Sequence, residues 1–360
     1  MHWNCKKKRI INMIIIVILY IYVFQFALPI YNHMRKYFTI QNNGDQQNVD
    51  NSQGKNRCLT KMSNDFCKTC INGWHGNDCG IPPHLGNVII TERETVSYIV
   101  QATILNHEIH MLKLKIDNSL PYTDEFVVIE GDMTFALEPK EFYLQKYVSK
   151  LQSFVKLRQH HVHIQTKDKY SWDVQNEMRL SNTTLHELYP DIPLNAIIIF
   201  TDVDECIRPE VLHFLKYYDS TPFPTSVQWN TYLFGFFFHD SHIIRLSSLG
   251  TVYQSPLSIR KQPNTWTIPQ GGWHCRWCST IEDIQTKLKS SPFVDLPRIA
   301  DNPEFMKPSA IYDHIIKGKW FLGNKTIPRS EPRDVPLNTP IYMRSYDWWL
   351  QHPPPNNTVY

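Results

Sequence analysis

The sequence lacks a strong net charge and has none of the usual signs of a nucleic-acid-binding protein. Its 37 Lys and Arg are nearly matched by 34 Asp and Glu, which leaves a formal net charge of +3 at pH 7. It contains no arginine-rich tract and no RNP-like run, which would indicate a nucleic-acid interface. So small a charge also gives no argument for an acidic membrane surface as partner. We therefore expect no nucleic-acid partner.

Long apolar runs are also lacking, except at one place. Residues 10–30 are nearly all apolar and include no charged residue, and the basic cluster Lys6–Arg9 precedes them. About 20 apolar residues span a bilayer as a helix, and a basic cluster before the span favours a cytoplasmic N-terminus. A cleaved signal peptide is the alternative, but its apolar region covers only about 7–15 residues, and no small-residue cleavage site follows this run. The pattern predicts a type II signal anchor, with residues 1–9 as the cytoplasmic tail.

The segment after the anchor divides into a polar part and a cysteine-rich part. Residues 31–57 contain a stretch of Asn, Gln, Asp, Ser and Gly with few apolar side chains, which predicts a flexible stem. Residues 58–80 look like the C-terminal half of an EGF-like module and need disulfides, because so short a segment has almost no core. We prefer the pairs Cys58–Cys67 and Cys70–Cys79, although sequence does not determine connectivity. Zinc is the competing interpretation, but no second Cys-x-x-Cys follows nearby.

The remainder, residues 87–350, alternates short apolar strands with amphipathic helices. Such alternation predicts an α/β domain with a mostly parallel sheet, and residues 351–360 form a C-terminal tail. From about Tyr312 the chain is rich in Pro and Trp, and we expect an irregular extension there. The predicted strands are Val88–Ile90, Val96–Ile104, Phe126–Ile129, His160–Ile164 and Ala196–Phe200; the predicted helices are Glu108–Ile116, Lys140–Leu157, Trp172–Leu188 and Glu210–Tyr218.

Three acidic residues directly follow the most apolar of these strands. Asp202, Asp204 and Glu205 come after Ala196–Phe200 within a few residues. Ligands of open α/β sheets bind at the carboxyl ends of strands, and carboxylates gathered there are costly unless a positive charge neutralises them. A hard divalent cation with oxygen ligands, Mg²⁺ or Mn²⁺, answers that need. Asp202 and Asp204 are thus predicted metal ligands, while a surface acidic turn or a helix N-cap is the alternative.

Several stretches of this sequence resemble glycosyltransferase family 17. The resemblance runs from about Cys58 to Trp349, and its most specific part is the string Gly-Trp-His-Cys-Arg-Trp-Cys at residues 272–278. Other matching stretches are Asn106–Glu108, Phe126–Val128 with Glu130, Thr201–Glu205 with Val211–Lys216, Tyr232–Phe237 and Pro340–Tyr342.

The resemblance implies a reaction as well as a fold. It implies a GT-A-like domain that binds UDP-N-acetylglucosamine with Mn²⁺. It also implies inverting β-1,4 transfer to the β-linked core mannose of an N-glycan on a glycoprotein, in the Golgi lumen. Glu210 stands where the family has Asp, which leaves acceptor specificity open. A lectin-like or inactive transferase-like membrane protein, which binds glycans without transfer, is the alternative.

The resemblance also suggests roles for individual residues. Asp202 and Asp204, with Glu205 beside them, take the metal and diphosphate role. An inverting transfer needs a base for the acceptor hydroxyl, and Glu282 is the first candidate, with Glu130 and Asp283 as reserves; for each, a solvated surface carboxylate is the alternative.

Other residues of the 272–278 string have two open interpretations each. His274 could contact a phosphate or the metal, or be a hydrogen-bonded structural side chain. Trp273 and Trp277 could line a sugar-binding face or pack in the core. For Cys275 and Cys278 we expect a structural disulfide, with each other or of one of them with Cys206, rather than a redox pair.

Overall fold

The computed structural model describes residues 81–82, 90–152, 155–168, 172–180, 185–219, 225–240, 245–251, 267–292, 295–332, 335–336 and 338–354. The anchor, the stem and the cysteine-rich segment predicted within residues 1–80 lie outside these residues. Within the described ranges, no helix combines the length and the apolar character needed to cross a membrane.

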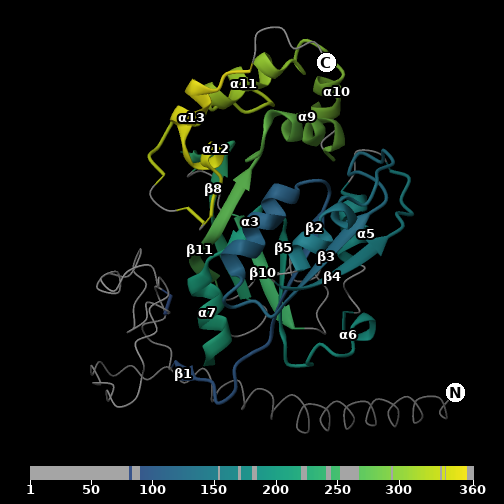
Figure 1. The fold of residues 1–360 in the computed structure, drawn as a ribbon, viewed down its shortest axis with the longest axis vertical. Coiled ribbons are helices and arrows are strands. Elements are labelled where there is room, and N and C mark those ends of the chain that lie inside the picture. Colours follow the sequence, from purple (N-terminus) through teal and green to yellow (C-terminus); the bar gives the residue numbers. More distant parts are fainter. Residues whose placement is uncertain are drawn as a thin grey trace, which may run out of the picture. The chain divides into compact units, whose positions relative to one another are not determined.

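One mixed sheet organises the described part of the chain (Figure 1). Its strand order is β4-β3-β2-β5-β10-β8-β11-β6, and β9 pairs with β8 off this path. The strands are β2 (Ile99–Leu105), β3 (Glu125–Gly131), β4 (Lys156–Val162), β5 (Ile197–Asp202), β6 (Glu205–Ile207), β8 (Thr225–Leu233), β9 (Gly235–His239), β10 (Arg245–Thr251) and β11 (Thr267–Arg276), while β1 (Thr91–Glu92) and β7 (Tyr218–Asp219) form a separate antiparallel pair.

The prediction of an α/β fold is confirmed, but the sheet is less parallel than expected. Strands β4, β3, β2 and β5 are parallel neighbours, as are β8 and β11. The pairs β5–β10, β10–β8, β8–β9 and β11–β6 are antiparallel. The reason is local for β8 and β9, because Phe234 alone separates them and adopts a positive φ of 61°, and so short a connection can only join antiparallel strands.

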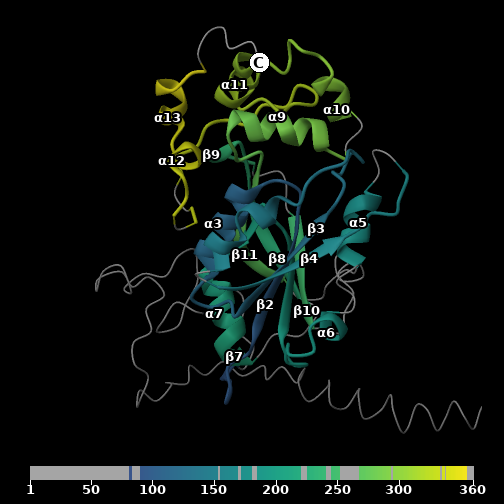
Figure 2. The same ribbon diagram turned by 45° about the vertical axis from the view of Figure 1, so that its right-hand side comes forward.

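Helices cover both faces of the parallel part of the sheet. Helices α3 (Ile109–Ser119) and α7 (Pro209–Tyr217) lie on one face, and α5 (Asp173–Leu180) and α6 (Leu185–Leu188) lie on the other (Figures 1 and 2). Side chains alternate accordingly along β3: Phe126 and Val128 join the core cluster of α3, while Val127 and Ile129 join that of α5. Strands buried on both faces read as continuous apolar runs, which explains why they stood out in the sequence.

Further helices gather beyond the carboxyl ends of the central strands (Figures 1 and 2). They are α9 (Ile281–Ser290), α10 (Asp295–Ala300), α11 (Pro308–Lys317), α12 (Ile341–Arg344) and α13 (Tyr346–Gln351). Their core includes Ile284, Ile311 and Trp349, and it packs against Phe234 and Phe237. The expectation of an irregular extension from about Tyr312 is wrong for the end of α11 and for α12 and α13, where Pro340 directly precedes α12 instead of preventing it, whereas residues 318–332 form no helix.

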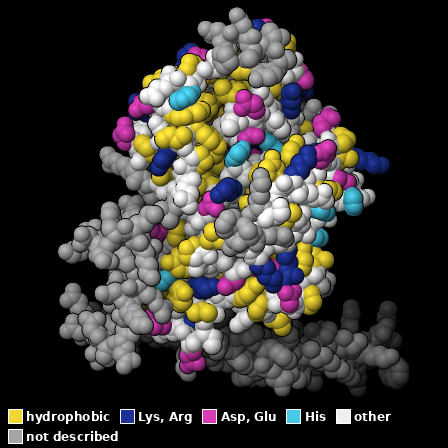
Figure 3. Space-filling model, viewed as in Figure 1, with side chains coloured by type: hydrophobic (Ala, Val, Ile, Leu, Met, Phe, Trp, Pro, Cys, Tyr) yellow, Lys and Arg dark blue, Asp and Glu magenta, His cyan; other side chains and the backbone are white. Residues whose placement is uncertain are grey.

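The predicted helix Lys140–Leu157 is also wrong in extent. The chain forms the short 3-10 helix η4 (Tyr143–Lys146) and then α4 (Val148–Gln152), and β4 begins at Lys156. Glu130 favours a helical start at Tyr143 rather than at Lys140, because its buried carboxylate accepts hydrogen bonds from the backbone N–H groups of Tyr143 and Leu144. On the face shown in Figure 3, acidic and basic side chains of the described residues are interspersed.

Candidate active site

The candidate site lies where the strand order of the parallel sheet reverses direction. The chain passes from β2 through α3 to β3 on one side, while β5 lies on the other side of β2. Ile104 of β2 pairs in register with Asp202 of β5, so the two strands end together. Such a switch point is where open α/β sheets bind ligands. A cavity of about 150 Å³ lies here, lined by Ile104, Asn106, Glu108, Phe135, Trp172, Gln175, Asp202, Val203, Asp204, His274, Arg276, Trp277, Lys287, Ser290, Ser291, Pro292 and Trp320.

A buried lysine holds residues 202–205, here called the acidic turn, in place. Lys115 of α3 is fully buried, and its Nζ donates to Thr201 Oγ1 (2.5 Å), to the Asp202 carbonyl (2.7 Å) and to the Glu205 carbonyl (2.8 Å). Burial lowers the pKa of Lys115, against the opposing effect of Cys206 and the nearby carboxylates. Glu205 closes the turn from within, because its Oε2 accepts the Asp202 N–H at 2.8 Å. The cavity-facing positions of the two aspartates thus depend on a side chain about 90 residues earlier in the chain.

We expect Lys115→Met to destabilise the fold by about 3 kcal/mol, because it leaves buried acceptors without a donor. Urea unfolding measures this. Lys113→Met is the matched control, since Lys113 lies on the same helix with an exposed side chain that pairs only with Asp117 four residues on. That control should shift the free energy of unfolding by less than about 0.5 kcal/mol. Equal stability of the two variants would contradict the proposed role of Lys115 in holding the acidic turn.

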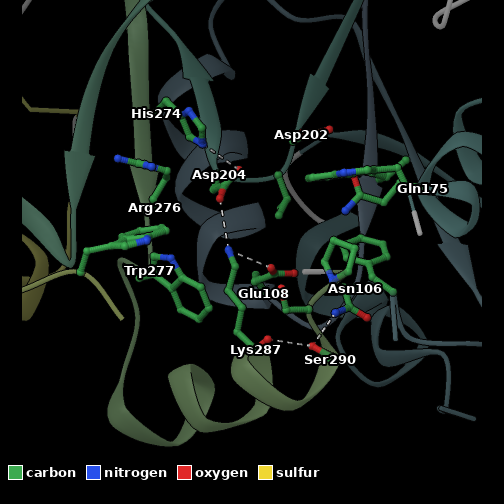
Figure 4. A pocket seen from close by; sticks show the side chains of 17 residues that line it. Asn106, Glu108, Gln175, Asp202, Asp204, His274, Arg276, Trp277, Lys287 and Ser290 are labelled. Carbon is green, nitrogen blue, oxygen red and sulfur yellow. Dashed lines mark hydrogen bonds and ion pairs between the residues drawn. The ribbon is translucent and has the colours of Figure 1, made fainter. Parts of the chain in front are cut away.

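Asp204 is ionised and faces two cationic or polar partners. Its Oδ2 lies 3.2 Å from Lys287 Nζ, and its Oδ1 lies 3.6 Å from His274 Nε2 (Figure 4). Burial by itself opposes ionisation, but Lys287 and His274 outweigh it and hold the pKa of Asp204 well below its usual range. The backbone fixes the same junction, because the Cys275 N–H donates to the Asp204 carbonyl at 3.0 Å.

Lys287 joins Asp204 to a second buried carboxylate. It extends from α9, and its Nζ lies 3.2 Å from Glu108 Oε1 and 5.5 Å from the centre of the Trp277 ring (Figure 4). Burial opposes ionisation of Glu108, but the charges of His107 and Lys287 lower its pKa to about 2. Burial likewise opposes protonation of Lys287, yet Asp204 and Glu108 raise its pKa. The result is a fixed ammonium between two fixed carboxylates.

Asp202 has a different cationic partner from Asp204. Its Oδ1 accepts a hydrogen bond from Arg179 Nη2 at 2.7 Å, and its side chain is 25% exposed. Arg179 lies on α5, and its Nη2 also donates to Gln175 Oε1 at 3.0 Å. The two aspartates are therefore supported from opposite sides of the cavity, by α5 and by α9.

Three of the predicted site residues line the cavity: Asp202, Asp204 and His274. The other five do not. Glu205 closes the acidic turn, Glu130 binds Lys140 Nζ at 2.7 Å and caps η4, and the Trp273 ring packs 4.4 Å from the Arg208 guanidinium carbon. Asp283 accepts the Ser279 hydroxyl at 2.7 Å, and Glu282 is exposed on the first turn of α9. Their placement does not support a base role for Glu282, Glu130 or Asp283.

The structure also resolves the alternatives for the 272–278 string. Cys275 pairs with Cys278, and Cys206 is a buried free thiol. The two residues enclosed by this disulfide, Arg276 and Trp277, both line the cavity. Trp277 adopts a positive φ of 61°, which is uncommon for a bulky residue.

Comparison with known proteins gives a family to this site. The family model described as glycosyltransferase family 17 matches residues 88–324, which include Lys115, the acidic turn and Lys287. The chain belongs to glycosyltransferase family 17. It is 26% identical to beta-1,4-mannosyl-glycoprotein 4-beta-N-acetylglucosaminyltransferase of Rattus norvegicus, with 81% of this chain and 63% of the relative covered. The Homo sapiens protein of the same name is 26% identical, with 77% and 60% covered, and that of Mus musculus is 25% identical, with 81% and 63% covered.

The family 17 chain thus spans about three fifths of the length of these relatives. Among solved structures, an Enterococcus italicus Csm6 chain aligns over 34% of this chain and 30% of its own, with 17% identity and a TM-score of 0.22. That similarity is too low to bear on fold or function.

Sequence reasoning missed four residues of this family 17 site, namely Lys115, Arg179, Lys287 and the cavity role of Glu108. Each lies far in sequence from Asp202 and Asp204 or on a different element. One signal was present, because the family resemblance included Asn106–Glu108. The lysines and the arginine carry no local signal, since a single basic residue on an amphipathic helix usually faces solvent.

Proposed function

We propose that this family 17 chain is an inverting, metal-dependent glycosyltransferase. It would transfer N-acetylglucosamine from UDP-N-acetylglucosamine to the β-linked core mannose of N-glycans, in a β-1,4 linkage. The names of the relatives support the sugar, the acceptor and the linkage. The observation that best supports a transfer reaction is the ionised Asp204 beside Lys287 in a cavity at the switch point of the sheet.

We infer that the acidic turn holds a divalent cation, Mn²⁺ or Mg²⁺, together with the donor, because carboxylates and an imidazole are there to bind it, although Arg179 and Lys287 pair with the two aspartates in this structure. Within the described residues no three His, Cys, Asp or Glu side chains gather around a common metal position. Fewer suffice for such ions, because substrate phosphates and water supply the remaining ligands. Asp204 and His274 would hold the ion, with Asp202 beside them. When bound, it would neutralise charge on the diphosphate of the donor.

Two cationic side chains of the protein, Lys287 and Arg276, would also neutralise charge on the diphosphate. Lys287 is held by Glu108, and Arg276 is held by Asp240, whose Oδ2 accepts from Arg276 Nη2 at 2.9 Å. The Arg276 guanidinium carbon lies 4.8 Å from the centre of the Trp320 ring. Preorganised charges of this kind stabilise charge that develops on a leaving group without reorganisation during the reaction. Lys287 and Arg276 therefore bind and orient the diphosphate in this proposal.

The base that takes the proton of the acceptor hydroxyl stays a prediction. Comparison of Glu108→Gln with Glu282→Gln tests whether Glu282, the first candidate, is that base. We expect Glu108→Gln to lower kcat about 10²-fold, because Lys287 loses one of its two carboxylate partners. Glu282→Gln should change kcat by no more than about twofold, since its side chain is exposed and does not line the cavity. Steady-state kinetics with saturating donor measure both, and the reverse result would favour Glu282 as the base.

The proposed location is the Golgi membrane, as a single-pass type II protein with a lumenal catalytic domain. The basic residues Lys6–Arg9 and the apolar residues 10–30 support it.

The direct test of the proposed function uses the full-length chain in detergent. Transfer is measured by mass spectrometry of N-glycan acceptors with a panel of UDP-sugars, in Mn²⁺, in Mg²⁺ and in EDTA. We expect transfer of N-acetylglucosamine with Mn²⁺ and loss of transfer with EDTA. Absence of transfer to any acceptor together with absence of UDP binding would refute the proposal. Glycan binding without transfer would favour the lectin-like alternative.

A further inference from the structure

Helix α5 and the residue before it border the cavity in a regular pattern. Trp172, Gln175 and Arg179 are spaced by three and four residues, which places them on the same side of a helix. Trp172 and Gln175 line the cavity, and Arg179 reaches Asp202. The opposite face of α5 carries Val174 and Met178, which are fully buried against the sheet. The helix therefore anchors itself with one face and presents the other to the ligand.

Trp172 differs from the other aromatic residues of the cavity in its exposure. Its residue exposure is 46%, whereas Trp277, which also lines the cavity, is 5% exposed. The Trp172 carbonyl accepts the Asn176 N–H at 2.9 Å, so its backbone belongs to the first turn of α5. Phe135, which follows β3, lines the same cavity. A large, exposed aromatic side chain at a cavity on a fixed helix end suits a flat ligand group that covers it.

The position of α5 indicates which group that is. Phe135 and α5 follow β3 and β4, the two strands on the side of β2 away from β5, and nucleotides bind across the carboxyl ends of such strands. Arg276, Trp277 and Lys287 come from β11, the turn after it and α9, on the opposite side from Gln175 (Figure 4). The diphosphate must lie near Asp202 and Asp204, between these two walls. Trp172 precedes Arg179 by seven residues, which is roughly 10 Å along a helix and comparable to the reach of a nucleoside from its base to its phosphates.

We propose that the cavity-facing side of α5 is the nucleoside subsite of the donor, in which Trp172 stacks on the pyrimidine base. Gln175 lies along the path from base to phosphate, and Arg179 holds Asp202 beside the phosphates. This inference rests on the proposed function, because it presumes a nucleoside diphosphate donor. It leaves the acceptor glycan to the wall formed by Trp277 and Trp320.

The test compares UDP with inorganic pyrophosphate as probes for the full-length chain, by isothermal titration calorimetry in Mn²⁺. A base stacked on an aromatic ring contributes enough that Trp172→Ala should weaken UDP binding roughly 5- to 100-fold. Binding of pyrophosphate should stay unchanged, because it has no base. Trp172→Phe should keep most of the affinity for UDP. The matched control is Tyr147→Ala, since Tyr147 is 39% exposed and does not line the cavity.

The other outcomes overturn the inference in distinguishable ways. Equal loss of UDP and pyrophosphate affinity in Trp172→Ala would show a general disturbance of the site. Unchanged UDP affinity with a raised KM for the glycan would assign Trp172 to the acceptor. If the unmodified chain bound neither UDP nor any other nucleoside diphosphate, the proposed function would fail together with this inference.

Discussion

Asp204→Asn should lower kcat for sugar transfer by about 10³-fold or more while the protein stays folded. Asn is nearly isosteric but uncharged, so the variant removes the ionised group that faces Lys287 and His274. The substitution removes a ligand of the proposed divalent cation and one of the fixed charges around the proposed diphosphate site, and each such element is worth about 10²–10³ in rate. Steady-state kinetics measure the effect, and near-ultraviolet circular dichroism reports whether tertiary packing is intact.

The control for this substitution is Asp283→Asn. Asp283 is also an aspartate near the site, but its side chain accepts the Ser279 hydroxyl and does not line the cavity. Its kcat should change by no more than about twofold. A folded Asp204→Asn protein with near-normal kcat would refute the assignment of Asp204 to the reaction.

Lys287→Met should reduce both stability and activity, with a loss of about 3 kcal/mol in the free energy of unfolding. The ammonium lies between Asp204 and Glu108, both of which have lowered pKa values. Its removal leaves two mostly buried carboxylates without their shared cation, and breaking a buried ion pair in this way typically costs about 3–5 kcal/mol. Urea unfolding measures the change.

A double variant separates charge from packing in this prediction. Lys287→Met combined with Glu108→Gln should recover roughly 1–2 kcal/mol relative to additivity, because it removes one of the unpaired charges. Lys289→Met on the exposed face of the same helix is the control and should be nearly neutral. Equal stability of Lys287→Met and the unmodified chain would contradict the role of the lysine as a buried counter-ion.

Some of the errors in the predicted fold have a common physical origin. The mostly parallel sheet was inferred from alternating strands and helices, but β10 and β6 are antiparallel to their neighbours, and pairing of that kind depends on partners distant in sequence. The predicted helix of residues 140–157 overlooked the buried carboxylate of Glu130, which starts a 3-10 helix from a neighbouring strand. In both cases tertiary contacts overrode the local pattern.

The candidate site shows the same division between local and distant information. The sequence by itself determined that a buried strand ends in an acidic turn at Asp202 and Asp204, because burial and hydrophobic runs are local properties. It also indicated His274, although only through a family resemblance. For the base it favoured Glu282, which shares α9 with Lys287 but is exposed. Glu282 and Lys287 are five residues apart on α9 and therefore lie on different sides of the helix. The packing of α9 decides which of these sides faces the cavity.

Only the tertiary structure determined which basic side chains contact the acidic turn. Lys115, Arg179 and Lys287 come from three different helices, and each donates to a different part of the turn. None of these partners follows from sequence spacing, because other helices and strands separate each of them from the acidic turn. The carboxylates were readable in the sequence because they follow a buried strand directly. Their counter-charges were not, because ion pairing depends on distance in space and the sequence records only distance along the chain.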